Sequence, residues 1–130
     1  MSNLSEEIDR LAEEIKSLRS HPLFVMYYYE TAGRISHEDV EDIYDEFRRR
    51  GWNRDDLHDD LDVLIHSYGG DANASYRVGQ ILHDFAKNIV FLAPFYAMSG
   101  GTIVCLGGKE IRLGAYASLS PIDIRLGDLS

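Results

Sequence analysis

The sequence predicts an α/β domain with a largely parallel sheet flanked by helices. Two mostly apolar segments, residues 61–66 and 88–93, are predicted to be buried strands, and the second has the composition of a strand that is covered on both faces. Each segment leads into a glycine pair and then into a stretch of helical length. Two successive strand–turn–helix units are typical of parallel sheets, because neighbouring parallel strands need a helical connection.

Residues 3–19 are expected to form an amphipathic helix at the N-terminus. Its apolar residues are spaced alternately by four and three positions, as in a coiled-coil seam: Leu4, Ile8, Leu11, Ile15 and Leu18. This seam predicts packing either on the helix's own domain or against a second subunit, and the spacing does not decide between them. We therefore divide the chain into an amphipathic helix over residues 1–20 and an α/β domain over residues 21–130.

Between this helix and the first buried segment, the sequence predicts one strand and one helix. Residues 23–29 follow the helix breaker Pro22 and are rich in aromatic and branched side chains, which favours a strand. Ser36 is a favoured N-cap for the helix, and Gly51 is expected to end it. The acidic residues 55–60 lack the spacing of a calcium loop, so we interpret them as a solvated connection and expect no metal site.

Three more elements are expected after residue 66. Residues 72–86 carry an apolar stripe at helical spacing, and a second helix is expected from Ser99 to the pair Gly107–Gly108. Residues 110–113 alternate between polar and apolar side chains, which predicts a strand with one solvated face.

The composition argues against several classes of partner. The net charge is −9, and both nucleic acids and anionic membranes require a basic surface. The N-terminal residues lack the pattern of a signal peptide, and no apolar run approaches the ~20 residues of a membrane span. Cys105 is the only cysteine and has apolar neighbours, which predicts a buried thiol and no disulfide. We therefore expect a cytoplasmic protein.

Ser99 is the candidate for a chemically active side chain. It precedes an apolar run of helical length, so its hydroxyl would face the unpaired N–H groups at a helix N-terminus. Gly100 and Gly101 leave room for a substrate backbone. A nucleophile beside an oxyanion site has this pattern. A serine that only caps a buried helix has the same pattern, so both interpretations stay open.

A second glycine turn, Gly69–Gly70, follows the strand 61–66. Ligands of parallel α/β sheets bind where the carboxyl ends of strands meet helix N-termini, so both glycine turns are expected at one edge of the sheet. His66 precedes the turn. It is interpreted either as a group that polarises a substrate or orients Ser99, or as a packed histidine bonded to the backbone.

Three motifs in order resemble the serine dehydrogenase proteinase family. They are His66-Ser-Tyr-Gly-Gly70, Tyr96-Ala-Met-Ser-Gly-Gly-Thr102 and Ser118-Leu-Ser-Pro-Ile-Asp123, and they span residues 61–124. The members of this family are Clp-fold serine proteinases related to signal peptide peptidase A and, more distantly, to ClpP and the crotonases. The resemblance implies a Clp/crotonase-like domain whose C-terminal part is short or missing in this chain.

The resemblance also implies roles for individual residues. Ser99 matches the nucleophile, and the backbone N–H groups of Gly70 and Gly100 match the oxyanion hole. His66, Gly69 and Gly101 are supporting residues. Relatives take the general base, a histidine or a lysine, from well beyond the nucleophile, and no base is identified in this sequence.

Two functions are consistent with these features. The first is a serine endopeptidase that cleaves peptide or protein substrates through Ser99 without a cofactor. The sequence contains neither a P-loop nor a Gly-x-Gly-x-x-Gly turn. The second is a catalytically inactive Clp-fold subunit that acts in assembly or peptide binding. Because Clp-fold relatives work as multimers, the resemblance implies a homo-oligomer in both cases.

Overall fold

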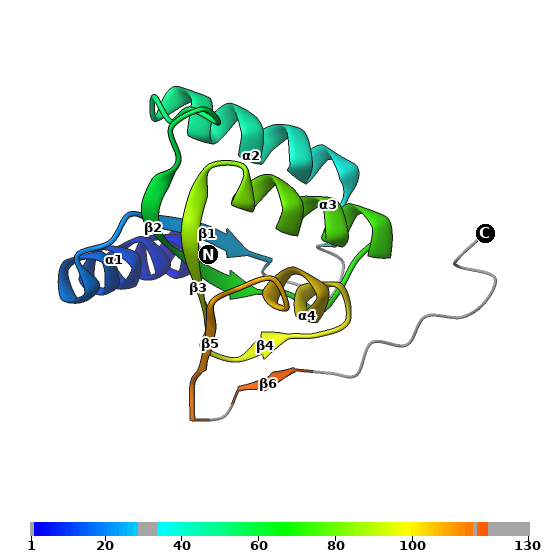
Figure 1. The fold of residues 1–130 in the computed structure, drawn as a ribbon. Helices are drawn as coiled ribbons and strands as arrows, with labels where there is room; N and C mark the ends of the chain where they lie inside the picture. The colour runs from blue at the N-terminus through cyan, green and yellow to red at the C-terminus, as the bar shows by residue number, and fades with distance from the viewer. Residues whose placement is uncertain (1, 29–33, 116, 120–130) are drawn as a thin grey trace.

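The computed structural model describes residues 2–28, 34–115 and 117–119. Figure 1 shows helices packed on a sheet, with strands and helices largely alternating along the chain. The elements are α1 (Ser2–Arg19), β1 (Leu23–Tyr27), α2 (His37–Arg49), β2 (His58–His66), α3 (Ala72–His83), β3 (Ala86–Ala93), β4 (Tyr96–Ala97), α4 (Gly100–Cys105), β5 (Glu110–Leu113) and β6 (Ser118–Leu119). The predicted fold class, a largely parallel sheet flanked by helices, is confirmed.

A parallel sheet of four strands forms the centre of the domain. Its strand order is β1-β2-β3-β5, and each neighbouring pair is parallel. In the central strand β2, Leu64 pairs with Val25 of β1 and Leu92 of β3. The short strands β4 and β6 form a second parallel pair. Because the strands of the main sheet run in one direction, their carboxyl ends share one edge.

The helices α2 and α3 cover one face of the sheet (Figure 1). The core between them and the sheet is aromatic and aliphatic, and the rings of Phe47 and Phe85 lie 5.3 Å apart between their centroids. Ser36 occupies the N-cap of α2, and its backbone N–H donates to Asp39 Oδ2 at 2.8 Å. Gly51 follows this helix with a φ of 80°, so both predicted ends of α2 are confirmed.

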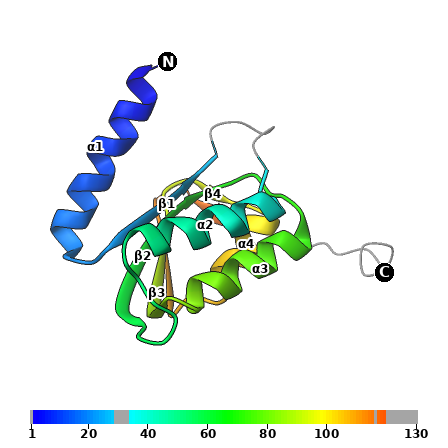
Figure 2. The same cartoon turned by 90° about the horizontal axis from the view of Figure 1, so that it is seen from above.

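The helix α1 lies on the opposite side of the sheet from α2 and α3 (Figure 2). Its last residue, Arg19, donates from Nε and Nη2 to the two carboxylate oxygens of Asp62, at 2.5 and 3.0 Å. Asp62 belongs to β2 and is 1% exposed, and His21 Nδ1 lies 3.3 Å from the same carboxylate. Since side chains alternate along a strand, Asp62 faces away from the core helices and holds α1 on the second face.

The apolar seam of α1 is only partly covered. Ile8 is 7% exposed, whereas Leu11 is 43% exposed and Leu18 is 85% exposed. The side chain of Leu4 lies outside the described part of the structure. Of the helices within the described ranges, none combines the length and the apolar character that crossing a bilayer requires.

The structure differs from the predicted elements in three places. β2 begins at His58, so residues 58–60 belong to the sheet, where His58 pairs with Ala86 and Asp60 with Asn88. The interpretation of all of 55–60 as a solvated connection was therefore wrong for its second half. α3 ends at His83, and β3 already begins at Ala86. The strands β4 and β6, of two residues each, were not predicted.

Candidate active site

The turns that follow β2 and β4 lie side by side at the carboxyl edge of the sheet. Ser67 continues β2 and forms a parallel bridge with Ala97 of β4. The Ser67 N–H donates to the Tyr96 carbonyl at 2.9 Å, and the Met98 N–H donates to the Ser67 carbonyl at 3.0 Å. Two backbone bonds therefore fix the segment that leads into Ser99 against the segment that leads into Gly69.

Ser99 has an unusual backbone conformation, with φ 50° and ψ −111°. Such positive φ values are strained for residues other than glycine, at a cost of roughly 1–3 kcal/mol, and they concentrate at functional sites. The surrounding backbone supports the conformation: Thr102 Oγ1 donates to the Ala97 carbonyl at 2.5 Å, and the Gly101 N–H donates to the Met98 carbonyl at 2.9 Å. The Ser99 side chain is exposed at the junction between β4 and α4.

Ser99 stands at the N-cap position of α4, but its side chain makes no capping hydrogen bond. The interpretation of Ser99 as a simple cap predicts a bond from the hydroxyl oxygen to an N–H group in the first turn. The strained backbone of this residue is therefore not explained by capping.

The Gly69–Gly70 turn packs directly against Ser99. A Cβ atom built on Gly69 would lie 3.3 Å from Ser99 Cβ and 3.7 Å from Ser99 Oγ, and Gly69 itself has a φ of 135°. Covalent geometry then limits the distance from Ser99 Oγ to the Gly70 nitrogen to less than about 8 Å. Glycine is required at position 69 both by its φ and by the close approach.

Gly100 brings the second glycine turn against the first. A Cβ atom on Gly100 would lie 3.1 Å from the Gly70 nitrogen and 2.4 Å from Ser75 Oγ. Gly101 packs in the same way on the end of β2, since its Cβ atom would lie 3.3 Å from the Cβ of Ser67. The structure thus brings together the N–H-bearing residues Gly70 and Gly100 and the hydroxyl of Ser99.

Ser75 belongs to this cluster, although the sequence analysis did not single it out. It is buried in the first turn of α3, and its hydroxyl donates to the Asp71 carbonyl at 2.8 Å. Asp71 caps α3, where its Oδ1 accepts from the Ala74 N–H at 2.8 Å. A small side chain is needed at position 75 because Gly100 approaches it closely. A serine in the first turn after a Gly-Gly-Asp segment was the only signal in the sequence.

His66 lies at the same edge of the sheet but within an aromatic cluster. Its ring stacks on Tyr27 at 4.5 Å between centroids, and the rings of Tyr68 and Tyr96 lie 5.3 and 5.8 Å away. The residue is 5% exposed, and within the described residues its Nδ1 has no hydrogen-bond partner. It is packed, as one interpretation expected, but the structure contains no bond from its Nδ1 to the backbone of a described residue.

Burial lowers the pKa of His66, because desolvation disfavours the imidazolium. The unfolded chain therefore binds a proton at a higher pH than the folded chain does. We expect the free energy of unfolding to fall as the pH drops below about 6.5, by at most about 1.4 kcal/mol per pH unit for this group. Denaturant titrations between pH 7.5 and 5 measure this slope.

The variant His66→Phe keeps a ring in the aromatic cluster and removes the titration, so its pH slope should be shallower than that of the wild type. Equal slopes for the wild type and His66→Phe would show that His66 does not contribute.

Lys109 lies beside the middle of β3, away from the carboxyl edge of the sheet. It follows the carboxyl end of α4, and its backbone N–H donates at 2.8 Å to the carbonyl of Ile89 in β3. This carbonyl precedes the carboxyl end of β3 by four residues. We therefore do not assign Lys109 as the general base, and no base is assigned among the described residues.

Cys105 is fully buried in α4, as its apolar neighbours predict. Burial raises the pKa of its thiol to about 12, so this cysteine carries no thiolate at neutral pH. The third motif of the sequence, from Ser118 to Asp123, lies mostly outside the described residues.

A similar fold also occurs among solved structures. A mutant ClpP1 from Listeria monocytogenes aligns with 72% of this chain and 50% of its own chain, with a TM-score of 0.54 and 17% sequence identity. At this identity the likeness shows that the two proteins share a fold. The predicted Clp-like architecture is thereby confirmed.

The chain is also similar in sequence to two proteins and to one family. Two uncharacterised proteins of Methanocaldococcus jannaschii are each 34% identical over 67 residues, which is 52% of this chain. The matched region spans only 23% of the length of each of these relatives. Residues 32–130 match the family described as ClpP-like SDH-type serine proteinases. The chain therefore belongs to the family of ClpP-like SDH-type serine proteinases.

Proposed function

We propose that this chain is the nucleophile-bearing part of a serine peptidase in which Ser99 attacks the scissile carbonyl of a peptide or protein substrate. The observation that carries the proposal is the strained, exposed Ser99, with φ 50° and ψ −111°, packed against the Gly69–Gly70 turn. A nucleophile must be accessible and held in one orientation, and a serine at such a turn meets both requirements.

The oxyanion formed by that attack is assigned to backbone donors. The N–H groups of Gly70 and Gly100 come from turns that touch one another. Preorganised donors of this kind stabilise the charge that develops in the transition state, and losing one typically costs on the order of 100- to 1,000-fold in kcat. Gly69, Gly101 and His66 act in support by allowing close packing or by shaping the wall of the site.

The general base is none of the residues assigned above. It is supplied by another chain or by a segment that is not among the described residues. Without a base the Ser99 hydroxyl is a weak nucleophile, since general base catalysis contributes on the order of 100- to 10,000-fold. The described part of the chain should then bind and orient a substrate better than it cleaves one.

A catalytically inactive subunit for assembly or peptide binding is the second candidate. It is favoured by the same missing base, and it requires the glycine turns only as a binding surface. The two candidates differ in whether Ser99 reacts at all.

The test is the reaction of the isolated 130-residue chain with a fluorophosphonate, followed by mass spectrometry. We expect slow labelling at Ser99 that is absent in Ser99→Ala, together with little or no turnover of peptide substrates. Ser20→Ala is the matched control, because Ser20 is also exposed and has a φ of 57° but has no glycine turn beside it. Ser20→Ala should label like the wild type.

The outcomes separate the two functions. Adding a protein partner that supplies a lysine or histidine base should accelerate labelling if the chain is part of a peptidase. Complete inertness of Ser99 under every condition would favour the inactive subunit. Rapid labelling of the isolated chain would show that a base is present within it, and His66 would be the first residue to substitute.

We also propose that the protein is cytoplasmic and self-associates. Leu11 and Leu18 of α1 are exposed, and Val25 and Leu113, on the two outer strands of the sheet, are 36% and 49% exposed. Burying such apolar surface between copies is favourable. Sedimentation at high concentration should reveal species larger than the 14.8 kDa monomer.

The double substitution Leu11→Ser with Leu18→Ser should shift sedimentation towards the monomer. Glu6→Ser with Glu13→Ser, at exposed charged positions of the same helix, is the control and should not. A wild-type chain that sediments only as a monomer would contradict the proposal.

A further inference from the structure

We propose that the groove between the carboxyl ends of α1 and α2 binds a small polyanion that carries phosphate groups. The groove has a volume of about 720 Å³ and lies at the end of the sheet opposite to Ser99. Its lining consists of Lys16, Ser20, His21, Pro22, Leu23, Arg50, Trp52 and His58. This lining contains two permanent cations and two histidines but no carboxylate, in a chain whose net charge is −9.

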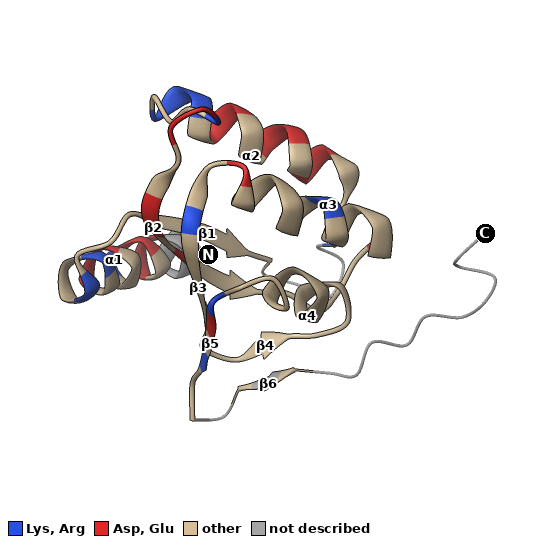
Figure 3. Cartoon of the chain, in the orientation of Figure 1, with Lys and Arg blue, Asp and Glu red and all other residues tan. Residues whose placement is uncertain are grey.

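Acidic residues outnumber basic residues by 22 to 13 in this chain, and several of the basic residues lie at the carboxyl ends of α1 and α2 (Figure 3). The last turn of α1 carries Lys16 and Arg19, and that of α2 carries Arg48 and Arg49, with Arg50 at the C-cap. Cations at helix carboxyl ends are expected, because they offset the negative end of the helix dipole. Helix dipoles alone therefore explain why cations are present, but they do not explain why the Arg50 side chain is only 30% exposed.

Arg50 is the central group of the groove. Its guanidinium carbon lies 5.3 Å from the centroid of Phe47, 5.8 Å from that of Trp52 and 6.0 Å from that of Phe24. Its one ion pair joins Nε to Glu46 at 4.0 Å, and no hydrogen bond links its guanidinium to another described residue. Burial lowers the pKa of this guanidinium, because the water removed from around it is not fully replaced by protein hydrogen-bond acceptors. An anion in the groove would supply the missing acceptors.

The neighbouring cations are also available for a ligand. Among the described residues, Lys16 Nζ makes one ion pair, with Glu13 at 3.6 Å, and this pair is exposed and of the kind that contributes little. His21 is different, because it is already engaged by Asp62 and lies 3.9 Å from Asp60. We therefore assign the ligand to Arg50 and Lys16, which match a phosphate group by a planar fork and a point charge respectively.

Trp52 forms part of the wall of the groove and does not offer a free ring face on which a ligand could stack. Its ring stacks on Phe47 at 4.9 Å and on His58 at 3.8 Å between centroids. Since neighbouring rings already pack against the indole, recognition of an aromatic ligand by stacking on it is not expected. Charge is then the main source of affinity, which favours a compact polyanion such as pyrophosphate over a planar organic molecule.

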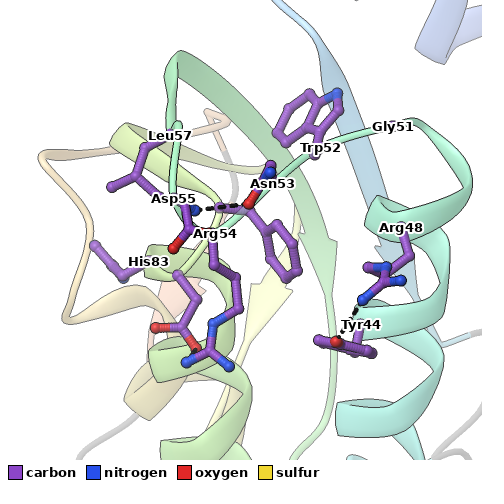
Figure 4. A pocket seen from close by; sticks show the side chains of 11 residues that line it. Tyr44, Arg48, Gly51, Trp52, Asn53, Arg54, Asp55, Leu57 and His83 are labelled. Carbon is purple, nitrogen blue, oxygen red and sulfur yellow. Dashed lines mark hydrogen bonds and ion pairs between the residues drawn. The ribbon is translucent and has the colours of Figure 1, made fainter.

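A second cavity beside the groove provides an internal comparison. It has a volume of about 780 Å³ and lies between the carboxyl ends of α2 and α3, with Trp52 on its wall as well (Figure 4). Its arginines are already paired: Arg54 lies 3.1 Å from Asp84, and Arg48 Nη1 donates to Tyr44 OH at 2.9 Å. Asp55 and Asp84 also line it. An anion should therefore prefer the groove at Arg50.

The test uses Trp52 as a reporter, because it is the only tryptophan in the chain. Inorganic pyrophosphate, inorganic phosphate and citrate are titrated into the full chain at constant ionic strength, with calorimetry in parallel. We expect saturable binding of pyrophosphate that is tighter than that of phosphate or citrate. Arg50→Gln and Lys16→Gln should each weaken it about tenfold, the loss expected for one charge-assisted hydrogen bond.

Two matched variants each remove one positive charge nearby without touching the groove. Arg49→Gln lies beside Arg50 on the exposed side of α2, and Arg54→Gln lies in the neighbouring cavity. The affinity of both variants for pyrophosphate should stay within about twofold of that of the wild type. At physiological salt the Debye length is ~8 Å, so charges farther from the ligand than this contribute little to binding. Circular dichroism confirms folding, and Lys16→Gln keeps the test valid if Arg50→Gln unfolds.

Three results would overturn the proposal. The first is the absence of saturable binding by both fluorescence and calorimetry. The second is an equal loss in Arg49→Gln and Arg50→Gln, which would indicate diffuse attraction by the basic helix end. The third is tighter binding of citrate than of pyrophosphate, which would reject the phosphate class.

Discussion

Gly70→Ala is expected to destabilise the protein by about 3 kcal/mol and to abolish the labelling of Ser99. The added Cβ would lie 2.4 Å from the carbonyl oxygen and 2.5 Å from the nitrogen of Ile35, which are backbone atoms. Overpacking of this kind costs roughly 1–3 kcal/mol. The shift would also disturb two backbone bonds, from Ile35 N–H to the Gly69 carbonyl at 3.1 Å and from Asp71 N–H to the Ile35 carbonyl at 3.0 Å.

Thermal unfolding measures the effect, with an expected fall in Tm on the order of 10 °C. The matched control is Gly79→Ala, in the middle of α3, where the added Cβ would have no neighbour nearer than 3.7 Å. This control should stabilise the helix by about 0.5–1 kcal/mol, because alanine loses less backbone entropy than glycine. Similar effects of the same sign in both variants would show that the contact between Gly70 and Ile35 is not tight.

Asp62→Ala is expected to lower the free energy of unfolding by about 3 kcal/mol, because it leaves a partly buried cation without its partner. Asp62 is 1% exposed and the side chain of Arg19 is 19% exposed, so water screens their bidentate pair weakly. The change also removes the bond that joins α1 to β2. We expect α1 to lose protection from hydrogen exchange before the sheet does.

Urea titrations compare this variant with two others. Arg10→Ala removes an arginine from the same helix whose ion pairs with Glu7 and Glu14 are exposed, and it should cost less than about 0.5 kcal/mol. The double substitution Arg19→Leu with Asp62→Leu should recover much of the lost stability, since an apolar pair needs no desolvated charges. A double variant that is less stable than both single variants would contradict the account.

The comparison of sequence with structure separates local from long-range determinants. Residues 61–66 and 88–93 were predicted as buried strands because most of their side chains are apolar, and that property is written in the sequence itself. The N-cap at Ser36 and the end of α2 at Gly51 were predicted for a similar reason, since caps depend on a few neighbouring residues. Fold class and family followed from such local signals and from the glycine motifs.

The short strands and the extended start of β2 had no such signal. Tyr96–Ala97 is a strand because it pairs with Ser118–Leu119 and bridges Ser67. Residues 58–60 are polar and read as a loop, and they join the sheet through pairing with β3. Pairing partners that lie about 20–30 residues away cannot be read from a window of a few residues.

For the candidate site too, some features could be predicted from the sequence and others only from the tertiary structure. The sequence by itself singled out the candidate residues, a serine followed by two glycines and a second glycine turn, because close approach and positive φ demand glycine at such places. Only the tertiary structure decided that Gly69 packs against Ser99, that Ser75 accommodates Gly100, and that His66 faces an aromatic cluster. Likewise the sequence showed Arg50 as one of three successive arginines, and only the tertiary structure placed its guanidinium beside the rings of Phe47 and Trp52. These contacts depend on how distant segments meet in space, which composition and periodicity do not encode.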